Sequence, residues 1–191
     1  MSEFIPPAKP IIGDEERAAV DRVMRSGMVA QGPEVAAFEA EFSEFFVPGR
    51  PSVAVNSGTA GLHLGLLAAG VGAGDEVIVP SFTFAATGNS VALTGATPVF
   101  VDIEPETFSL DPQAVAAAIT SKTKGILPVH LYGHPARMRE LEALAADRGV
   151  ALYEDAAQAH GASLDGRPVG TFGEIAMFSL YPTKNMTSGE G

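Results

Sequence analysis

Apolar and polar positions follow two different periods along residues 51–191. Short apolar runs, typical of buried strands, are interleaved with segments in which apolar residues recur at helical spacing. The predicted strands are Ser52–Val55, Glu76–Val79, Pro98–Val101, Gly125–Val129, Val150–Glu154 and Glu174–Leu180. The predicted helices are Thr59–Ala69, Phe84–Leu93, Pro112–Ile119 and Ala136–Arg148, and a tight turn is predicted at Leu164–Arg167. This alternation predicts an α/β domain with a mostly parallel sheet.

The first part of the chain has a different pattern. An extended arm precedes a helix over Glu15–Ser26, which Asp14 is expected to cap and Gly27 to end. A second helix, over Pro33–Phe46, begins with a proline at its first position and repeats apolar residues at helical spacing. The sequence therefore predicts an N-terminal arm with helices over residues 1–50, followed by the α/β domain.

The composition excludes several classes of protein. The 191 residues include no Cys, which rules out disulfide frameworks, thiolate metal sites and cysteine nucleophiles. Lys and Arg number 12 and Asp and Glu 23, and the net charge of −11 is unfavourable for binding nucleic acid or an anionic membrane. No apolar run is long enough for a signal peptide or a membrane span. We therefore expect a soluble cytoplasmic protein with no nucleic-acid or membrane partner.

Ligands of parallel α/β sheets bind at the carboxyl ends of the strands, so the segments after the strands are the candidates for chemistry. Asn56–Gly61 follows the first predicted strand and places small residues and hydroxyls at the start of a helix. Free N–H groups and the positive end of the helix dipole would make this segment a phosphate cradle. A plain Ser or Thr helix cap would account for the same residues.

Two further strand ends carry aromatic or acidic side chains. Ser81–Phe84 follows the second predicted strand, and an aromatic ring there would either cover a planar ligand or belong to the core. Glu154 and Asp155 end a later strand, where a buried carboxylate would need a cationic partner or several hydrogen bonds. In the alternative interpretation, Asp155 caps the following segment and Glu154 is exposed.

Lys184 is the one lysine expected on the ligand side of the sheet. The other three are Lys9, in the arm, and Lys122 and Lys124, beside the start of a strand. Lys184 follows the last predicted strand in a turn rich in Ser, Thr and Gly, where its amine could act as a Schiff-base nucleophile. A phosphate cradle, an aromatic cover, a strand-end carboxylate and a lysine amine are together what pyridoxal 5′-phosphate (PLP) requires.

Four segments carry a resemblance to a known family: NSGTAGL at 56–62, VPSFTFAAT at 79–87, EDAAQAHG at 154–161 and FSLYPTKNMTSGEG at 178–191. In this order, they are similar to the motifs of the DegT/DnrJ/StrS-type nucleotide-sugar aminotransferases, which are fold-type I PLP enzymes. The resemblance extends to the N-terminal segment GMVAQGPEVAAFE. It implies a three-layer αβα large domain with a mostly parallel sheet, truncated before the small C-terminal domain of the family.

The resemblance also assigns roles to residues of this chain. It implies that Lys184 is the catalytic residue that forms the Schiff base, and that Asp155 pairs with the pyridine nitrogen. Gln158 matches the residue near the phenolic oxygen of the ring, and Phe84 matches the ring-stacking aromatic better than Phe82 does. Three residues match the phosphate contacts: Gly58, Thr59 and Ser179.

The function implied by the resemblance is transfer of an amino group, in this family usually from glutamate, to the keto-sugar of a nucleotide-diphosphate sugar. The family implies a homodimer with active sites at the subunit interface, in deoxyaminosugar biosynthesis for surface polysaccharides or natural-product glycosides. Sugar dehydratases of the same fold carry His where this chain has Lys184, and a non-enzymatic regulator would not need the whole set of site residues. Tyr181 stands where many members carry His, which leaves the aminated sugar position open.

No metal site is expected. His130 and His134 have the spacing of metal ligands on a helix, but Gly133 and Pro135 would break a helix there and no third ligand is evident. The Gly-rich segment 70–74 precedes a strand, which is the wrong polarity for the dinucleotide loop of a Rossmann dehydrogenase. The family resemblance implies that the chain is about the N-terminal half of a two-domain enzyme, so that on its own it is expected to be unstable or inactive.

Overall fold

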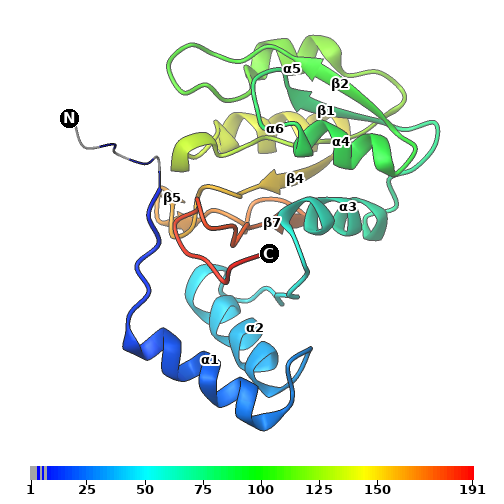
Figure 1. Cartoon of the computed structure of the whole chain (residues 1–191). Coiled ribbons are helices and arrows are strands. Elements are labelled where there is room, and N and C mark those ends of the chain that lie inside the picture. The colour runs from blue at the N-terminus through cyan, green and yellow to red at the C-terminus, as the bar shows by residue number, and fades with distance from the viewer. Residues whose placement is uncertain (1–3, 5, 7) are drawn as a thin grey trace.

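The computed structural model describes residues 4, 6 and 8–191. From residue 58 onward, helices and strands follow one another in the order that the sequence predicts (Figure 1). The helices are α3 (Gly58–Ala68), α4 (Ala86–Leu93), α5 (Pro112–Ala118) and α6 (Met138–Arg148), with a 3-10 turn η1 (Leu131–Gly133). The strands are β1 (Glu76–Pro80), β2 (Thr97–Val101), β3 (Thr123–Ile126), β4 (Ala151–Asp155), β5 (Ser163–Leu164), β6 (Arg167–Pro168) and β7 (Ile175–Met177).

Five strands form one parallel sheet in the order β2-β1-β3-β4-β7. The chain leaves β1 for β2 on one side and then adds β3, β4 and β7 on the other, so the strand order reverses between β1 and β3. The carboxyl ends of all five strands share one edge, which is where such sheets bind ligands. The predicted α/β fold is therefore confirmed. The turn predicted at Leu164–Arg167 joins the antiparallel pair β5 and β6.

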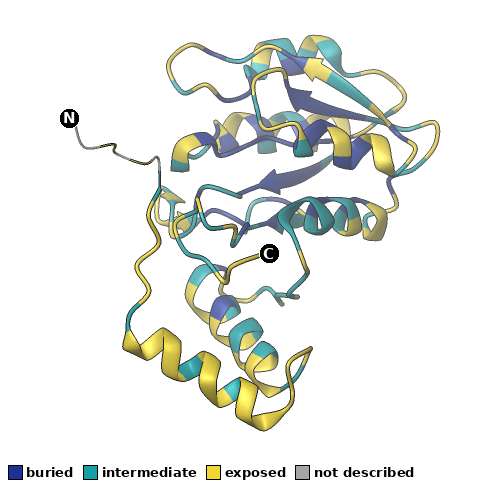
Figure 2. Cartoon of the chain, in the orientation of Figure 1, coloured by how far each residue is buried: buried dark blue, intermediate teal, exposed yellow. Residues whose placement is uncertain are grey.

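Helices cover both faces of the sheet and make three layers. Side chains alternate between the faces along β1: Val77 and Val79 pack with residues of α3 and α4, whereas Ile78 packs with residues of α5 and α6. Buried positions accordingly concentrate in β1 and β4 and on the helix sides next to them, whereas the edge strand β2 is mostly exposed or half-buried (Figure 2). Burial on both faces explains why the strands are continuous apolar runs rather than alternating ones.

The N-terminal helices α1 (Asp14–Ser26) and α2 (Pro33–Phe46) lie beside these layers and do not cover the sheet (Figure 1). Within α1, all of which the structure describes, no residue is buried, and α2 buries Phe42. The Phe42 ring contacts those of Phe178 and His160, at centroid distances of 5.2 and 6.3 Å. Aromatic packing thus attaches α2 to the end of β7. A domain boundary near residue 50 stays a prediction.

Two local predictions are wrong. Ser52–Val55 forms no strand in the described part of the chain, because the Ala54 N–H donates to Glu39 Oε1 at 2.8 Å and not to a neighbouring strand. Asp14, the expected cap, is the first residue of α1, and the preceding Gly13 N–H donates to Glu16 Oε2 at 2.6 Å. Over the residues that the structure describes, no helix has the length and apolar character needed to cross a membrane.

Candidate active site

A cavity of about 340 Å³ lies at the carboxyl edge of the sheet. Its walls come from five places: the start of α3, the segment between β1 and α4, the segment after β3, the end of β4, and the end of β7 with the loop that follows it. All the residues that the family motifs single out line this cavity: Gly58, Thr59, Phe84, Asp155, Gln158, Ser179 and Lys184. The fold therefore brings the predicted site residues together from four separate segments, in a volume typical of ligand pockets.

Helix α3 opens onto this cavity at its N-terminus. Ser57 caps the helix, since its hydroxyl accepts the Ala60 N–H at 3.1 Å and its carbonyl accepts the Gly61 N–H at 2.9 Å. The N–H groups of Gly58 and Thr59 have no acceptor among the described residues. Two free N–H groups at the positive end of a helix dipole form a position suited to an anion. A Ser cap and an anion-binding position thus occur in the same turn.

Gly58 allows α3 to lie directly against the end of β7. A Cβ at this position would come within 3.0 Å of Met177 Sδ, 3.2 Å of Ser179 Cβ and 3.4 Å of Ser179 Oγ. Ser179 is buried, and its hydroxyl donates to the Gly191 carbonyl at 3.2 Å. Because position 58 has no Cβ, the free N–H groups at the start of the helix can lie directly beside the Ser179 hydroxyl.

Asp155 ends β4 with its carboxylate at the cavity wall, and the residue is 4% exposed. Oδ2 accepts the Thr87 hydroxyl at 2.8 Å and Oδ1 accepts the Ala157 N–H at 3.2 Å, so each oxygen can accept a further donor. Burial raises the pKa of Asp155 above its ordinary value, opposed by these two hydrogen bonds and by the neighbouring side chains of His130 and Lys184. The sequence gives no sign of the Thr87 contact, because α4 and β4 meet only in the fold.

Glu154, the neighbouring carboxylate, lies outside the cavity and is fully buried. Its oxygens accept four hydrogen bonds, from His130 Nε2 at 3.1 Å and from the N–H groups of Gly170, Phe172 and Gly173 at 2.7–2.8 Å. Four donors use the whole accepting capacity of a carboxylate. Glu154 therefore ties the 170–173 loop to β4, and the interpretation in which it is exposed is wrong.

His130 is a second structural residue that the motifs do not reveal. Its Nδ1 accepts the Ala136 N–H at 3.0 Å, which assigns the ring hydrogen to Nε2 and makes Nε2 the donor to Glu154. Because both nitrogens are engaged, His130 has none left to join His134 in binding a metal. The described residues contain no cluster of three or more His, Asp or Glu side chains suited to a metal ion.

Gln158 and Phe84 provide two further parts of the cavity wall. Gln158 Oε1 accepts the Tyr132 N–H at 2.7 Å, which orients the side-chain amide and leaves its NH₂ group for a ligand. Phe84 is 75% exposed at the cavity, whereas Phe82 lies outside the lining and packs on Phe108 at a centroid distance of 6.1 Å. Of the two phenylalanines, Phe84 is therefore the one placed to cover a planar ligand.

Lys184 lies in the loop after β7, where its N–H donates to the Tyr181 carbonyl at 2.9 Å and closes a turn. Its side chain is partly buried and lines the cavity. It forms no salt bridge with any residue of the described chain. No carboxylate of the described chain therefore holds the amine.

A comparison with known protein families explains this set of residues. The model of the DegT/DnrJ/EryC1/StrS aminotransferase family matches residues 10–191. The chain belongs to this family. The enzymes of the family are PLP-dependent, and the resemblance implied by the sequence motifs is confirmed.

Three solved structures illustrate the similarity. S. venezuelae DesV is 49% identical, with a TM-score of 0.87 over 91% of this chain and 46% of DesV. The PLP-form of Spr1654 from Streptococcus pneumoniae is 35% identical, with a TM-score of 0.93 over 98% of this chain and 51% of Spr1654. DesI in the presence of its TDP-sugar product is 41% identical, with a TM-score of 0.84 over 92% of this chain and 44% of DesI. The chain spans about half the length of the relatives it matches.

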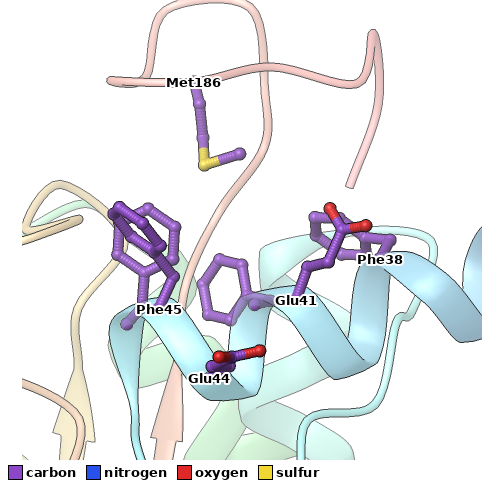
Figure 3. A pocket seen from close by; sticks show the side chains of 7 residues that line it. Phe38, Glu41, Glu44, Phe45 and Met186 are labelled. Atoms are coloured by element: carbon purple, nitrogen blue, oxygen red, sulfur yellow. The ribbon is translucent and has the colours of Figure 1, made fainter.

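This family member has a second hollow, between α2 and the loop that carries Lys184 (Figure 3). Phe38 and Phe45 line it from the helix, and Met186 faces them from the loop. None of the seven predicted site residues lines it. The hollow therefore separates the lysine loop from the N-terminal helix and does not extend the candidate active site.

Proposed function

We propose that the intact protein is a PLP-dependent aminotransferase that transfers an amino group, from glutamate, to the keto-sugar of a nucleotide-diphosphate sugar. The observation that carries the proposal is the meeting of a free helix N-terminus, the buried Asp155 carboxylate and the Lys184 amine in one cavity. Membership of the family supports the reaction class. The similarity to DesI, which was solved with its TDP-sugar product, supports a nucleotide-sugar substrate.

The side chains of the cavity fit PLP. Asp155 would pair with the protonated ring nitrogen, Phe84 would stack on the ring, and the free amide group of Gln158 would donate to the phenolic oxygen. Gly58 has no Cβ, so the start of α3 lies directly beside Ser179, and the phosphate would bind at this junction. Three groups would hold it there: the N–H groups of Gly58 and Thr59 and the hydroxyl of Ser179.

When bound, PLP supplies an electron sink for the carbon that gains or loses the amino group. Lys184 would hold the cofactor covalently as a Schiff base and, when its amine is free, would carry a proton on Nζ as general acid and base. The Asp155 carboxylate would hold a proton on the ring nitrogen, which requires that it stay ionised in spite of its burial.

The rest of the protein would complete this site. We propose that residues 51–191 belong to the PLP-binding large domain, and that a small C-terminal domain and the second subunit of a homodimer contribute to the active site. Among the described residues that line the cavity, Lys184 alone is basic. The phosphates of the cofactor and of a nucleotide sugar would therefore be neutralised by groups from elsewhere in the assembly, which supports a shared site.

Borohydride reduction tests the role of Lys184. The intact protein loaded with PLP should be yellow, and after reduction, mass spectrometry should find the cofactor mass on Lys184. K184A should carry no such adduct, whereas K122A should react as the wild type does, because Lys122 lies outside the cavity lining. An unmodified Lys184 in the reduced wild type would overturn the assignment.

Turnover tests the reaction class. With glutamate and a nucleotide-linked keto-sugar, the protein should form 2-oxoglutarate and the amino-sugar in equal amounts. A sugar dehydratase would remove water from the sugar without this exchange, and a regulatory relative would bind the ligands without turnover. Either of these two results would contradict the proposal.

A further inference from the structure

A chain of hydroxyl groups leads from the cavity wall to Asp155. Thr83 lines the cavity, and its Oγ1 lies 3.0 Å from Thr87 Oγ1. Thr87 is fully buried on α4 and donates to Asp155 Oδ2 at 2.8 Å, across a separation of 68 residues in the sequence. Among the described residues, Thr87 is the one side chain that hydrogen-bonds the Asp155 carboxylate directly.

The ionised carboxylate sets the direction of these hydrogen bonds. A carboxylate only accepts, so the single hydroxyl hydrogen of Thr87 must point to Asp155. Thr87 can then only accept from Thr83, whose hydrogen is committed in turn. Hydrogen bonds in series polarise one another, and a bond to a charged acceptor is stronger than one to a neutral acceptor. Both bonds therefore favour the ionised form of Asp155.

Thr87 contributes an important share of the stabilisation of the ionised Asp155 carboxylate, because the other groups that face it contribute less directly. Besides Thr87, a backbone N–H and the side chains of His130 and Lys184 favour its charge against burial. His130 is engaged as a neutral ring with Glu154, whose own charge is already met by four donors. In the proposed function, Lys184 is the residue that binds the cofactor covalently. The hydrogen bond from Thr87 thus stabilises the ionised carboxylate independently of the state of Lys184.

We propose that Thr87 is a positioning residue whose hydroxyl, backed by that of Thr83, keeps the Asp155 carboxylate ionised and directed at the cavity. The inference rests on the proposed function, in which Asp155 pairs with the ring nitrogen of PLP. Thr87 does not line the cavity, so it acts through Asp155 and not by touching the cofactor. Loss of its hydroxyl should weaken cofactor binding most at acidic pH, where Asp155 gains a proton most easily.

The test removes the hydroxyl while keeping the shape of the side chain. In the intact protein, T87V loses the hydrogen bond and T87S retains it. S90A is a matched control, because Ser90 is a buried hydroxyl of the same helix that donates to the Thr87 carbonyl at 2.9 Å and does not touch Asp155. The dissociation constant of PLP is measured by absorbance over a series from acidic to neutral pH.

T87V should bind PLP about tenfold more weakly at neutral pH and lose it at a higher pH than the wild type on acidification, whereas T87S and S90A should stay within about threefold of the wild type. A T87V protein with the affinity and pH dependence of S90A would overturn the proposal. Equal weakening in T87V and S90A would also overturn it, since the cause would then be the packing of α4.

A second measurement separates this inference from the proposed function. In the protein free of cofactor, ¹³C NMR follows the titration of the Asp155 carboxyl, and T87V should shift its midpoint to higher pH. If the wild type binds no PLP, the proposed function fails, but this titration still decides the role of Thr87. An unchanged midpoint in T87V would overturn the positioning role.

Discussion

The side chains of Glu154 and His130 form a fully buried pair, with 3.1 Å between Oε2 and Nε2. The two consecutive acidic residues that end β4 consequently have different roles. Glu154 is saturated by four donors outside the cavity, whereas Asp155 retains accepting capacity at the cavity wall. A motif with two similar carboxylates thus contains one structural group and one candidate cofactor ligand.

The saturation of Glu154 can be tested with a substitution that keeps its shape. E154Q replaces one accepting oxygen with an NH₂ group that must face N–H donors, so at least one buried hydrogen bond is lost. We expect the free energy of unfolding in urea to fall by about 2–4 kcal/mol. E174Q is the control, because Glu174 is exposed at the start of β7, and it should change little. Equal losses in the two variants would contradict the structural role of Glu154.

The layers of the fold and the place of the site follow from local sequence patterns. Parallel strands buried on both faces produce continuous apolar runs, and helices between them produce the longer period, so the order of elements can be predicted. Each predicted site residue follows a strand or begins a helix. Because parallel strands end at a common edge, Lys184 after β7 and Phe84 after β1 reach the same cavity although they are distant in sequence.

Long-range partners cannot be predicted in this way. Thr87 and Asp155 are 68 residues apart, and no local pattern shows that α4 brings a hydroxyl to the end of β4. The donors of Glu154 are mostly backbone N–H groups of a distant loop, which carry no signal in the side-chain sequence. Ser52–Val55 has the composition of a strand, but pairing depends on a neighbour, and Glu39 takes the Ala54 N–H instead.

In the protein without cofactor, the buried Asp155 carboxylate should make the wild type less stable at neutral pH than a variant without this ionisable group. Burial raises the pKa of Asp155, so between its ordinary and its raised pKa the native state binds more protons than the unfolded state. Stability therefore falls as the pH rises through this window. D155N has no such ionisation, and it should unfold at higher urea concentration than the wild type at neutral pH but not below the ordinary pKa of aspartate. If D155N is less stable than the wild type at neutral pH, the prediction that the buried Asp155 charge destabilises the native state is wrong.

The close approach of α3 to β7 predicts a specific effect at Gly58. In G58A the new Cβ would meet Met177 Sδ at 3.0 Å and Ser179 Cβ at 3.2 Å, so the helix N-terminus or Ser179 must shift. We expect PLP binding to weaken about tenfold and stability to fall by about 1 kcal/mol. G72A is the control, since a Cβ at Gly72 meets no described atom within 4 Å. Wild-type affinity for PLP in G58A would contradict a phosphate position at this turn.

Tyr153 has a buried hydroxyl without a hydrogen-bond partner among the described residues. The ring has little freedom to move toward one, because Gly125 lies so close to it that a Cβ there would collide with the ring. Burial, followed by the negative charges of Glu174 and Asp75, raises the pKa of Tyr153 to about 12. The hydroxyl therefore loses its water on folding and gains no bond in return.

Y153F should consequently stabilise the protein, by about 1 kcal/mol in the free energy of unfolding, because it removes an uncompensated buried polar group. Y132F serves as the control, since Tyr132 is 71% exposed and its hydroxyl loses little solvent on folding. That variant should change the free energy by less than about 0.5 kcal/mol. Both values come from urea unfolding at neutral pH. A clear loss of stability in Y153F would show that the hydroxyl has a partner in solution and would contradict the prediction.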